Sequence, residues 1–179
     1  MKRAILIVAI LALSAYCALW ALVDMGLRHN DTSSVPVGWY WYTPGPVYRG
    51  QLVQACLPIN LATFALDRGI ARIGSVCPGG VAPMVKVLAA VYPDVVTVRD
   101  DAVLIDGKPW PLSATPTHDK SGRPVPFRMK PGTYHVGPFQ VLLLGLSLRS
   151  WDGKIYGLMP RAIVTGTWTR VPWPFSLIP

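Results

Sequence analysis

The residues best suited to covalent chemistry are a group of hydroxyl side chains that precedes a proline. They lie in residues 30–40, which read NDTSSVPVGWY. A serine hydroxyl becomes a nucleophile only when a neighbouring base removes its proton. An ordinary turn is the alternative, because Asn, Asp, Ser and Thr side chains often bond to nearby backbone groups. A second residue that could act as the base is therefore needed.

Lys86 is the candidate base. Among the six lysines, it alone lies within an apolar stretch, residues 81–91, which read VAPMVKVLAAV. Burial disfavours the charged ammonium, so a buried lysine can lose its proton well below the usual pKa of about 10.4. The alternative is a lysine at a strand edge, with its aliphatic stem on apolar surface and its amine in water.

Two segments of the chain resemble sequence boxes of the conjugative-transfer leader peptidases, the TraF-type branch of the type I signal peptidases. Residues 30–40 look like the Asn-x-Thr-x-Ser-x-Pro-x-Gly-x-Tyr box, and residues 83–96 resemble the Lys-x-x-x-Ala-x-Pro-Gly-Asp-x-Val segment. The resemblance implies a serine/lysine dyad with Ser34 as nucleophile and Lys86 as general base. It also implies that the Ser34 N–H and the Thr32 hydroxyl bind the oxyanion, although a simple turn role for Thr32 stays open.

A third segment, residues 150–157 (SWDGKIYG), resembles the family's Ser-x-Asp-Ser-Arg-Tyr-Phe-Gly box with several replacements. The resemblance implies supporting roles, in which Ser150 orients the Lys86 amine and Asp152 pairs with a basic residue. Lys154 stands where the family has arginine, so it keeps the charge but loses the planar guanidinium. A turn with an exposed ion pair, worth under about 1 kcal/mol, is the alternative for Asp152 and Lys154.

The same resemblance implies where a substrate would lie. The residues expected to contact it follow the nucleophile or precede the lysine, namely Val35, Pro83, Met84 and Val85. The polypeptide would lie extended beside this strand and place small side chains in shallow pockets. The turn after the strand, residues 92–94, reads YPD where the family has Pro-Gly-Asp. That departure affects the turn and leaves the lysine in place.

The elements that must position these residues begin with an apolar helix. Residues 4–23 are uncharged, and at about 1.5 Å per residue they would span roughly 30 Å of hydrocarbon. Lys2 and Arg3 precede them, so the positive-inside rule places the amino terminus in the cytoplasm. A cleaved signal peptide, with an apolar region of about 7 to 15 residues, is the alternative. We expect residues 1–25 to be a single-pass inner-membrane anchor and residues 26–179 to be a periplasmic domain.

The exported part has the pattern of an all-β domain. Short apolar and aromatic stretches alternate with turns rich in the 18 prolines and 16 glycines. The predicted strands are residues 35–43, 51–57, 84–92, 95–99, 102–105, 134–146 and 162–171. A helix is predicted from Asn60 to about Gly69, and residues 111–131 are predicted to form a long loop. The expected fold is mainly β, a signal-peptidase-like coiled antiparallel β domain with one short helix behind the transmembrane helix.

Cys56 and Cys77 are candidates for a disulfide, because both lie in the part expected to be exported. A bridge there would stabilise the domain by about 3 kcal/mol. Two unpaired buried thiols are the alternative.

Composition excludes several other kinds of site. None of the nine acidic residues is glutamate, so a site built on paired glutamates is impossible. The three histidines are widely separated and the cysteines have no CxxC spacing, so we expect neither a metal nor another cofactor. The net charge of +8 comes from basic residues scattered singly, which favours contact with anionic lipid over nucleic acid.

Together these features predict a membrane-anchored serine endopeptidase that cuts an exported precursor, such as a pilin-like subunit of a conjugation system. If an amine replaced water in the second step, the same intermediate would give a cyclic pilin. A non-catalytic, membrane-anchored scaffold protein of a conjugation or secretion system would account for the anchor and the charge without using Ser34. A self-cleaving regulator with a similar dyad is a third class, against which the long anchor argues. The oligomeric state cannot be derived from the sequence.

Overall fold

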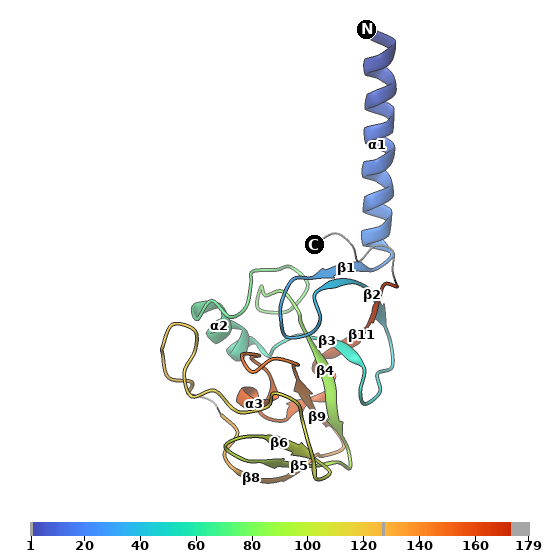
Figure 1. The fold of residues 1–179 in the computed structure, drawn as a ribbon. Helices are drawn as coiled ribbons and strands as arrows, with labels where there is room; N and C mark the ends of the chain where they lie inside the picture. The colour runs from blue at the N-terminus through green and yellow to red at the C-terminus, as the bar shows by residue number, and fades with distance from the viewer. Residues whose placement is uncertain (1, 127, 173–179) are drawn as a thin grey trace.

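The computed structural model describes residues 2–126 and 128–172, and it begins with one long helix, α1 (Lys2–Asp24), that projects from a β-rich body (Figure 1). None of the residues of α1 is buried against the body, and the helix is long and apolar enough to cross a membrane. Gly26 turns the chain immediately after the helix with φ +105°. A Cβ at this position would lie 2.5 Å from the carbonyl oxygen of Tyr42, so a glycine is required.

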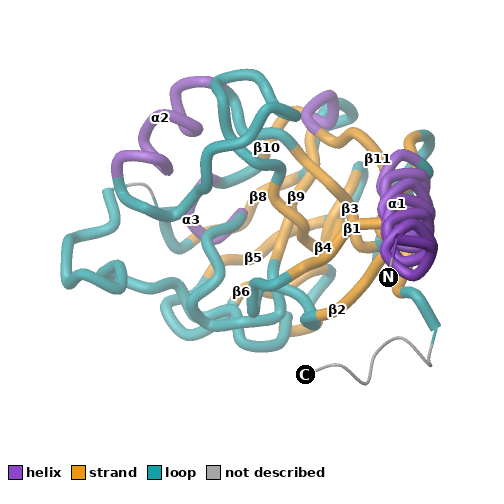
Figure 2. The backbone as a smooth tube through the Cα atoms, turned by 90° about the horizontal axis from the view of Figure 1, so that it is seen from above, coloured by secondary structure: helices purple, strands orange, loops and turns teal. Residues whose placement is uncertain are grey.

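Seven strands form the main sheet, and every neighbouring pair in it is antiparallel. In their order across the sheet they are β1 (Leu27–Asn30), β2 (Gly38–Pro44), β11 (Val164–Arg170), β3 (Leu52–Ala55), β4 (Met84–Val91), β9 (Gln140–Leu144) and β10 (Met159–Pro160). Seen from above in Figure 2, α1 stands at the side of the body that carries β1, β2 and β11. The chain therefore passes from α1 directly into β1, the strand at one edge of the main sheet.

A second, four-stranded antiparallel sheet lies at the end of the body far from α1 (Figure 1). Its order is β7 (Lys108–Pro109), β6 (Val103–Ile105), β5 (Val95–Val98) and β8 (Gly132–His135). Residues of β5 and β6 such as Val96 and Val103 pack with Ala90 of β4 and Leu142 of β9 in one buried cluster. This cluster joins the two sheets, and the mainly antiparallel β fold predicted from the sequence is confirmed.

Helices are few and short after α1. They are α2 (Ile59–Asp67), the single turn α3 (Gly153–Tyr156) and a 3-10 turn, η1 (Arg161–Ile163). The N-cap of α2 is Pro58, so the predicted start at Asn60 was wrong by two residues, although the helix exists. The helix α3 was not predicted, so the domain has more than the one short helix expected.

Two predicted strands have different boundaries in the structure. Residues 134–146 were predicted as one strand, but β8 ends at His135 and β9 begins at Gln140, and the two belong to different sheets. Residues 35–43 were predicted as a strand, but β2 begins only at Gly38 because residues 31–37 form a loop. This loop carries the candidate nucleophile.

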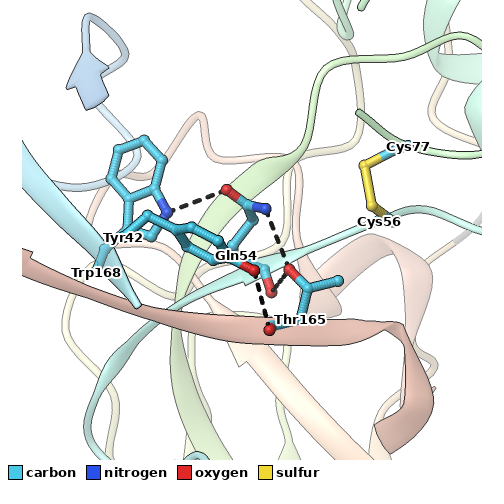
Figure 3. The surroundings of a disulfide bond; sticks show 6 residues. All are labelled: Tyr42, Gln54, Cys56, Cys77, Thr165 and Trp168. Atoms are coloured by element: carbon cyan, nitrogen blue, oxygen red, sulfur yellow. Dashed lines mark hydrogen bonds between the residues drawn. A yellow bond between two sulfur atoms is a disulfide. The ribbon is translucent and has the colours of Figure 1, made fainter. Parts of the chain in front are cut away.

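A disulfide joins Cys56, just after β3, to Cys77 in the loop that follows α2, with 5.4 Å between their Cα atoms. Figure 3 shows Gln54 close by, at the centre of a hydrogen-bond network. The Gln54 side chain donates to Thr165 Oγ1 at 3.1 Å and accepts from Trp168 Nε1 at 3.2 Å. The network fixes β3 against β11 beside the disulfide.

Candidate active site

The loop between β1 and β2, residues 31–37, is held from inside by Asn30. This side chain is only 5% exposed, and its amide donates to the backbone carbonyls of Thr32, Val35 and Pro36 at 2.9, 3.1 and 3.1 Å. Three hydrogen bonds from one buried amide fix the path of the loop. The sequence offered no role for Asn30 beyond its place in the box.

A backbone hydrogen bond to a distant segment of the chain also fixes the position of Ser34. Its carbonyl accepts a hydrogen bond from the Leu146 N–H at 2.7 Å, just beyond the end of β9. In addition, the hydroxyl of buried Tyr40 donates to the Pro36 carbonyl at 2.6 Å. These contacts place the Ser34 side chain at the junction of the loop with the β4–β9 region.

Lys86 lies in the middle of β4 and is only 5% exposed. Its Nζ donates to Ser150 Oγ at 3.0 Å. Burial lowers the pKa of Lys86 to about 8, with the positive charge of Lys154 acting in the same direction and the negative charge of Asp152 opposing it. Of the two positions open from the sequence, the structure places the Lys86 amine in the interior rather than in solvent.

Ser150 connects Lys86 to Ser34. The Ser150 side chain is 2% exposed, and its hydroxyl donates to Ser34 Oγ at 3.4 Å. This distance is longer than the usual 2.7–2.8 Å of an O–H···O bond. Across the described residues, no hydrogen bond joins Lys86 directly to Ser34, and the two side chains are connected through Ser150.

Asp152 and Lys154 form a buried pair next to the segment that carries Ser150. Asp152 is completely buried, and its carboxylate accepts from the Gly145 N–H at 2.8 Å and from the Lys154 N–H at 3.0 Å, which caps α3. The Lys154 Nζ lies 3.4 Å from Asp152 Oδ2 and its side chain is 1% exposed. The pair is therefore buried, unlike the exposed pair that the sequence allowed, and removing one partner would leave a buried charge uncompensated.

Gly145 lies against Ser150, Ser34 and Asp152, and its role was not predicted from the sequence. A Cβ built on Gly145 would overlap Ser150 Oγ, lie 2.6 Å from Ser150 Cβ and lie 3.0 Å from the Ser34 carbonyl oxygen. The only signal in the sequence was a single glycine at the end of an apolar strand, a pattern that often marks close backbone approach.

The two groups predicted to bind an oxyanion differ in their present contacts. The Ser34 N–H has no hydrogen-bond partner within the described chain. The Thr32 hydroxyl donates to Asn30 Oδ1 at 2.8 Å, and the Thr32 N–H contacts the same oxygen at 3.2 Å. Thr32 would have to turn its hydroxyl away from Asn30 to reach an oxyanion.

The residues predicted to contact substrate fall into two groups. Val35 and Val85 are 2% and 9% exposed and pack with Tyr40 and Trp168 in a small buried cluster. Pro83 and Met84, in contrast, are partly exposed. The buried valines can therefore limit the depth of a pocket, while the partly exposed residues can touch a polypeptide directly.

The edge of β4 beside Lys86 is open on one side. Residues from Met84 to Val87 pair with β3, but pairing with β9 begins only at Val87, opposite Leu144. Beyond Leu144 the chain turns toward the Ser34 loop. In the part of the chain that the structure describes, the backbone from Met84 to Lys86 therefore has an unpaired edge on the β9 side, where an extended peptide could add as a strand.

The arrangement has the parts required for acyl transfer. These parts are a hydroxyl on a fixed loop, a buried amine whose pKa is lowered, a second hydroxyl between them and a free backbone N–H at the nucleophile. An open strand edge lies beside them. No contact in this set requires a metal.

Comparison with known proteins identifies a matching family, two relatives and one solved structure. Residues 1–173 match the family described as signal peptidase, peptidase S26. The chain is 41% identical over 140 residues to a plasmid transfer protein TraF from Escherichia coli, which covers 76% of this chain and 77% of that protein. It is 34% identical over 165 residues to the conjugal transfer protein TraF of Agrobacterium tumefaciens, which covers 89% of each. A crystal structure of a signal peptidase I from Enterococcus faecalis aligns with a TM-score of 0.40 at 17% identity, covering 71% of this chain and 100% of that one.

Proposed function

The chain belongs to the signal peptidase family, peptidase S26, and on that premise we propose that it is a membrane-anchored serine endopeptidase that acts in conjugation. The observation that carries the proposal is the buried amine of Lys86, which is linked through Ser150 to the hydroxyl of Ser34. The relatives named as plasmid and conjugal transfer proteins support the conjugative role.

In the proposed mechanism, neutral Lys86 acts as general base. The Ser34 oxygen attacks the scissile carbonyl carbon while its proton passes to Ser150 and the Ser150 proton passes to Lys86 Nζ. The Ser34 N–H stabilises the oxyanion, and the Thr32 hydroxyl adds a second donor when it turns from Asn30. The leaving amine takes the proton from Lys86 and departs, which leaves an ester on Ser34.

The second step decides the product. If neutral Lys86 activates water, the ester is hydrolysed and the cut precursor is released. If an amine of the substrate attacks instead, the ester becomes a new peptide bond and the product is cyclic. Both outcomes use the same acyl-enzyme, so the geometry of this site is compatible with either.

We propose that the substrate is an exported, pilin-like precursor. Its backbone would bind along the open edge of β4 from Met84 to Lys86. Small side chains would fit beside the nucleophile because Val35 and Val85 already fill the interior behind them. The oligomeric state does not enter this proposal.

The proposed location is the inner membrane, with α1 as a retained single span. Lys2 and Arg3 would hold the amino terminus in the cytoplasm, and the β domain would lie in the periplasm. Lipid is then a permanent partner of the chain. Gly26 and β2 would hold the Ser34 loop near the outer surface of the bilayer.

The direct test is incubation of the full chain, in detergent, with the pilin precursor of the same conjugation system. Intact mass spectrometry separates the two products, because a hydrolysed product is heavier than a cyclised one by one water. Conversion to either product that depends on Ser34 supports the proposal. An intact precursor under all conditions would instead favour the non-catalytic scaffold.

The pH dependence of cleavage is expected to report on Lys86. Because burial lowers its pKa to about 8, the active neutral form is lost as the pH falls through that value. The value of kcat/KM should rise about ten-fold per pH unit below about pH 8 and level off above it. Initial rates from about pH 6 to pH 10 measure this curve. A flat profile over the same range would exclude Lys86 as the base.

Gly145→Ala is expected to lower kcat by about 10- to 100-fold, because the new methyl group would displace Ser150 from its position between Lys86 and Ser34. Gly137→Ala is a matched control, since a Cβ there meets only the flexible Gln140 side chain. Cleavage rates are compared after circular dichroism has shown that both variants fold. An unchanged kcat in Gly145→Ala would mean that the position of Ser150 is not important.

A further inference from the structure

A pocket with a volume of about 390 Å³ lies on the body of the protein and is not used by the proposed mechanism. One wall comes from the long loop between β7 and β8 and includes Thr115 and Lys120. The other wall comes from the segment between β9 and α3 and includes Leu148, Arg149 and Trp151. Arg149 and Trp151 flank Ser150 in sequence, so the segment that carries Ser150 also lines this pocket.

The charges around this pocket are predominantly positive. Asp119 also lines it, but its carboxylate is already bound to Arg123 Nε at 2.7 Å and to an Arg68 guanidinium nitrogen at 3.2 Å. Lys120 and Arg149 form no ion pair with any described residue, and both are exposed. Two unpaired cations therefore line the pocket, and the one acidic side chain among its described lining residues is already paired with arginines.

The remaining walls can hold an apolar group. The half-buried Trp151 ring is fixed by the rings of Phe64 and Tyr156, at centroid distances of 6.1 and 6.3 Å. Leu148 is 50% exposed. Thr115 contributes a hydroxyl that is buried without a hydrogen-bond partner. An apolar stem that ends in an anionic head would match both the rings and the cations.

We propose that this pocket binds a carboxylate of the precursor polypeptide that is cut at Ser34. The proposal rests on the proposed function, because it takes Ser34 as the point of cleavage. The carboxylate can belong to an acidic side chain or to the carboxyl terminus of the precursor.

The binding test uses the Ser34→Ala full chain in detergent, so that bound peptide stays intact. The probes are acetylated, amidated eight-residue alanine peptides that carry Glu or Gln at each position in turn, together with the same alanine peptide with a free carboxyl terminus. Calorimetry is expected to show that at least one carboxylate peptide binds about three- to ten-fold more tightly than its neutral partner, with less preference at high salt. The position of the preferred Glu, or a preference for the free terminus, identifies the source of the carboxylate.

Three variants assign the preference to this pocket. Lys120→Gln and Arg149→Gln should each remove most of it. Lys108→Gln is the matched control, since this exposed lysine lies on β7 outside the pocket and should leave the preference unchanged. Equal affinity for every Glu and Gln pair and for both termini, absence of binding, or an equal loss in Lys108→Gln would each overturn the inference.

A cleavage assay with Ser34 present separates this inference from the proposed function. If the pocket binds carboxylate but no peptide or precursor is cut, carboxylate binding stands as a property of the pocket, while the peptidase proposal and the assignment of the carboxylate to a cleaved substrate fail. If peptides are cut at Ser34 with the same kcat/KM for Glu and Gln partners, the peptidase proposal stands and the inference fails.

Discussion

Ser34→Ala is expected to lower kcat/KM for precursor cleavage by about four orders of magnitude or more, which is the usual effect of removing a nucleophile. No other hydroxyl in the described structure is positioned to replace it. Ser150 Oγ is near, but Ser150 is 2% exposed and a peptide carbonyl cannot reach it. The hydroxyl of Thr32 is bonded to Asn30. The loss is measured as the rate of appearance of the cut precursor.

Ser33→Ala is the control for this variant. Ser33 is the adjacent residue in the same loop, it is exposed, and its side chain forms no hydrogen bond within the described residues. Its removal should change the rate by less than about two-fold. Both variants should insert into membranes and fold like the original chain. If processing continues in Ser34→Ala, the peptidase proposal is wrong and the anchored scaffold becomes the better account.

The sequence was sufficient for those parts of the site that depend on local pattern. The single lysine in an apolar stretch made Lys86 the candidate base while leaving its amine free to lie in the interior or in water, and Lys86 is buried in β4. The antiparallel β architecture followed from short alternating stretches between turns. The pattern was less informative at strand ends, since the rigid loop before Gly38 contains Val35 and Pro36 and therefore resembles the start of a strand.

Contacts between distant segments could not be derived in this way. Ser150 lies 116 residues from Ser34 and 64 residues from Lys86. The family resemblance implied its contact with the Lys86 amine, but only the folded chain shows that Ser150 also contacts Ser34. Asp152 and Lys154 have the composition of an exposed turn, yet both are buried at the point where α3 packs against β9. Residues that are polar in a sequence are expected on the surface, so buried polar groups at a functional site are the ones that sequence patterns miss.

Lys86→Met should abolish cleavage and at the same time stabilise the domain. Methionine has a similar shape but no basic nitrogen, so kcat should fall by at least about three orders of magnitude. At neutral pH the original chain must hold a buried ammonium whose pKa is lowered from 10.5 to about 8, which costs on the order of 3 kcal/mol of folding free energy. Loss of the hydrogen bond from Lys86 to Ser150 reduces this gain in stability by about 1 kcal/mol. The net gain in free energy of unfolding is expected to be about 2 kcal/mol at pH 7.

The pH dependence of this gain identifies its cause. Below about pH 8 the lysine is protonated in both the folded and the unfolded chain, so the full cost is present. Between about pH 8 and pH 10.5 the folded chain releases the proton before the unfolded chain does, so the stability of the original protein rises with pH. The difference between Lys86→Met and the original chain should therefore shrink over that interval in urea titrations followed by tryptophan fluorescence. Lys108→Met should show no such change because Lys108 is exposed. If the difference in free energy of unfolding is the same at all pH values, the gain comes from packing. The pKa of Lys86 is then not lowered in the folded chain, as a general base at this position requires.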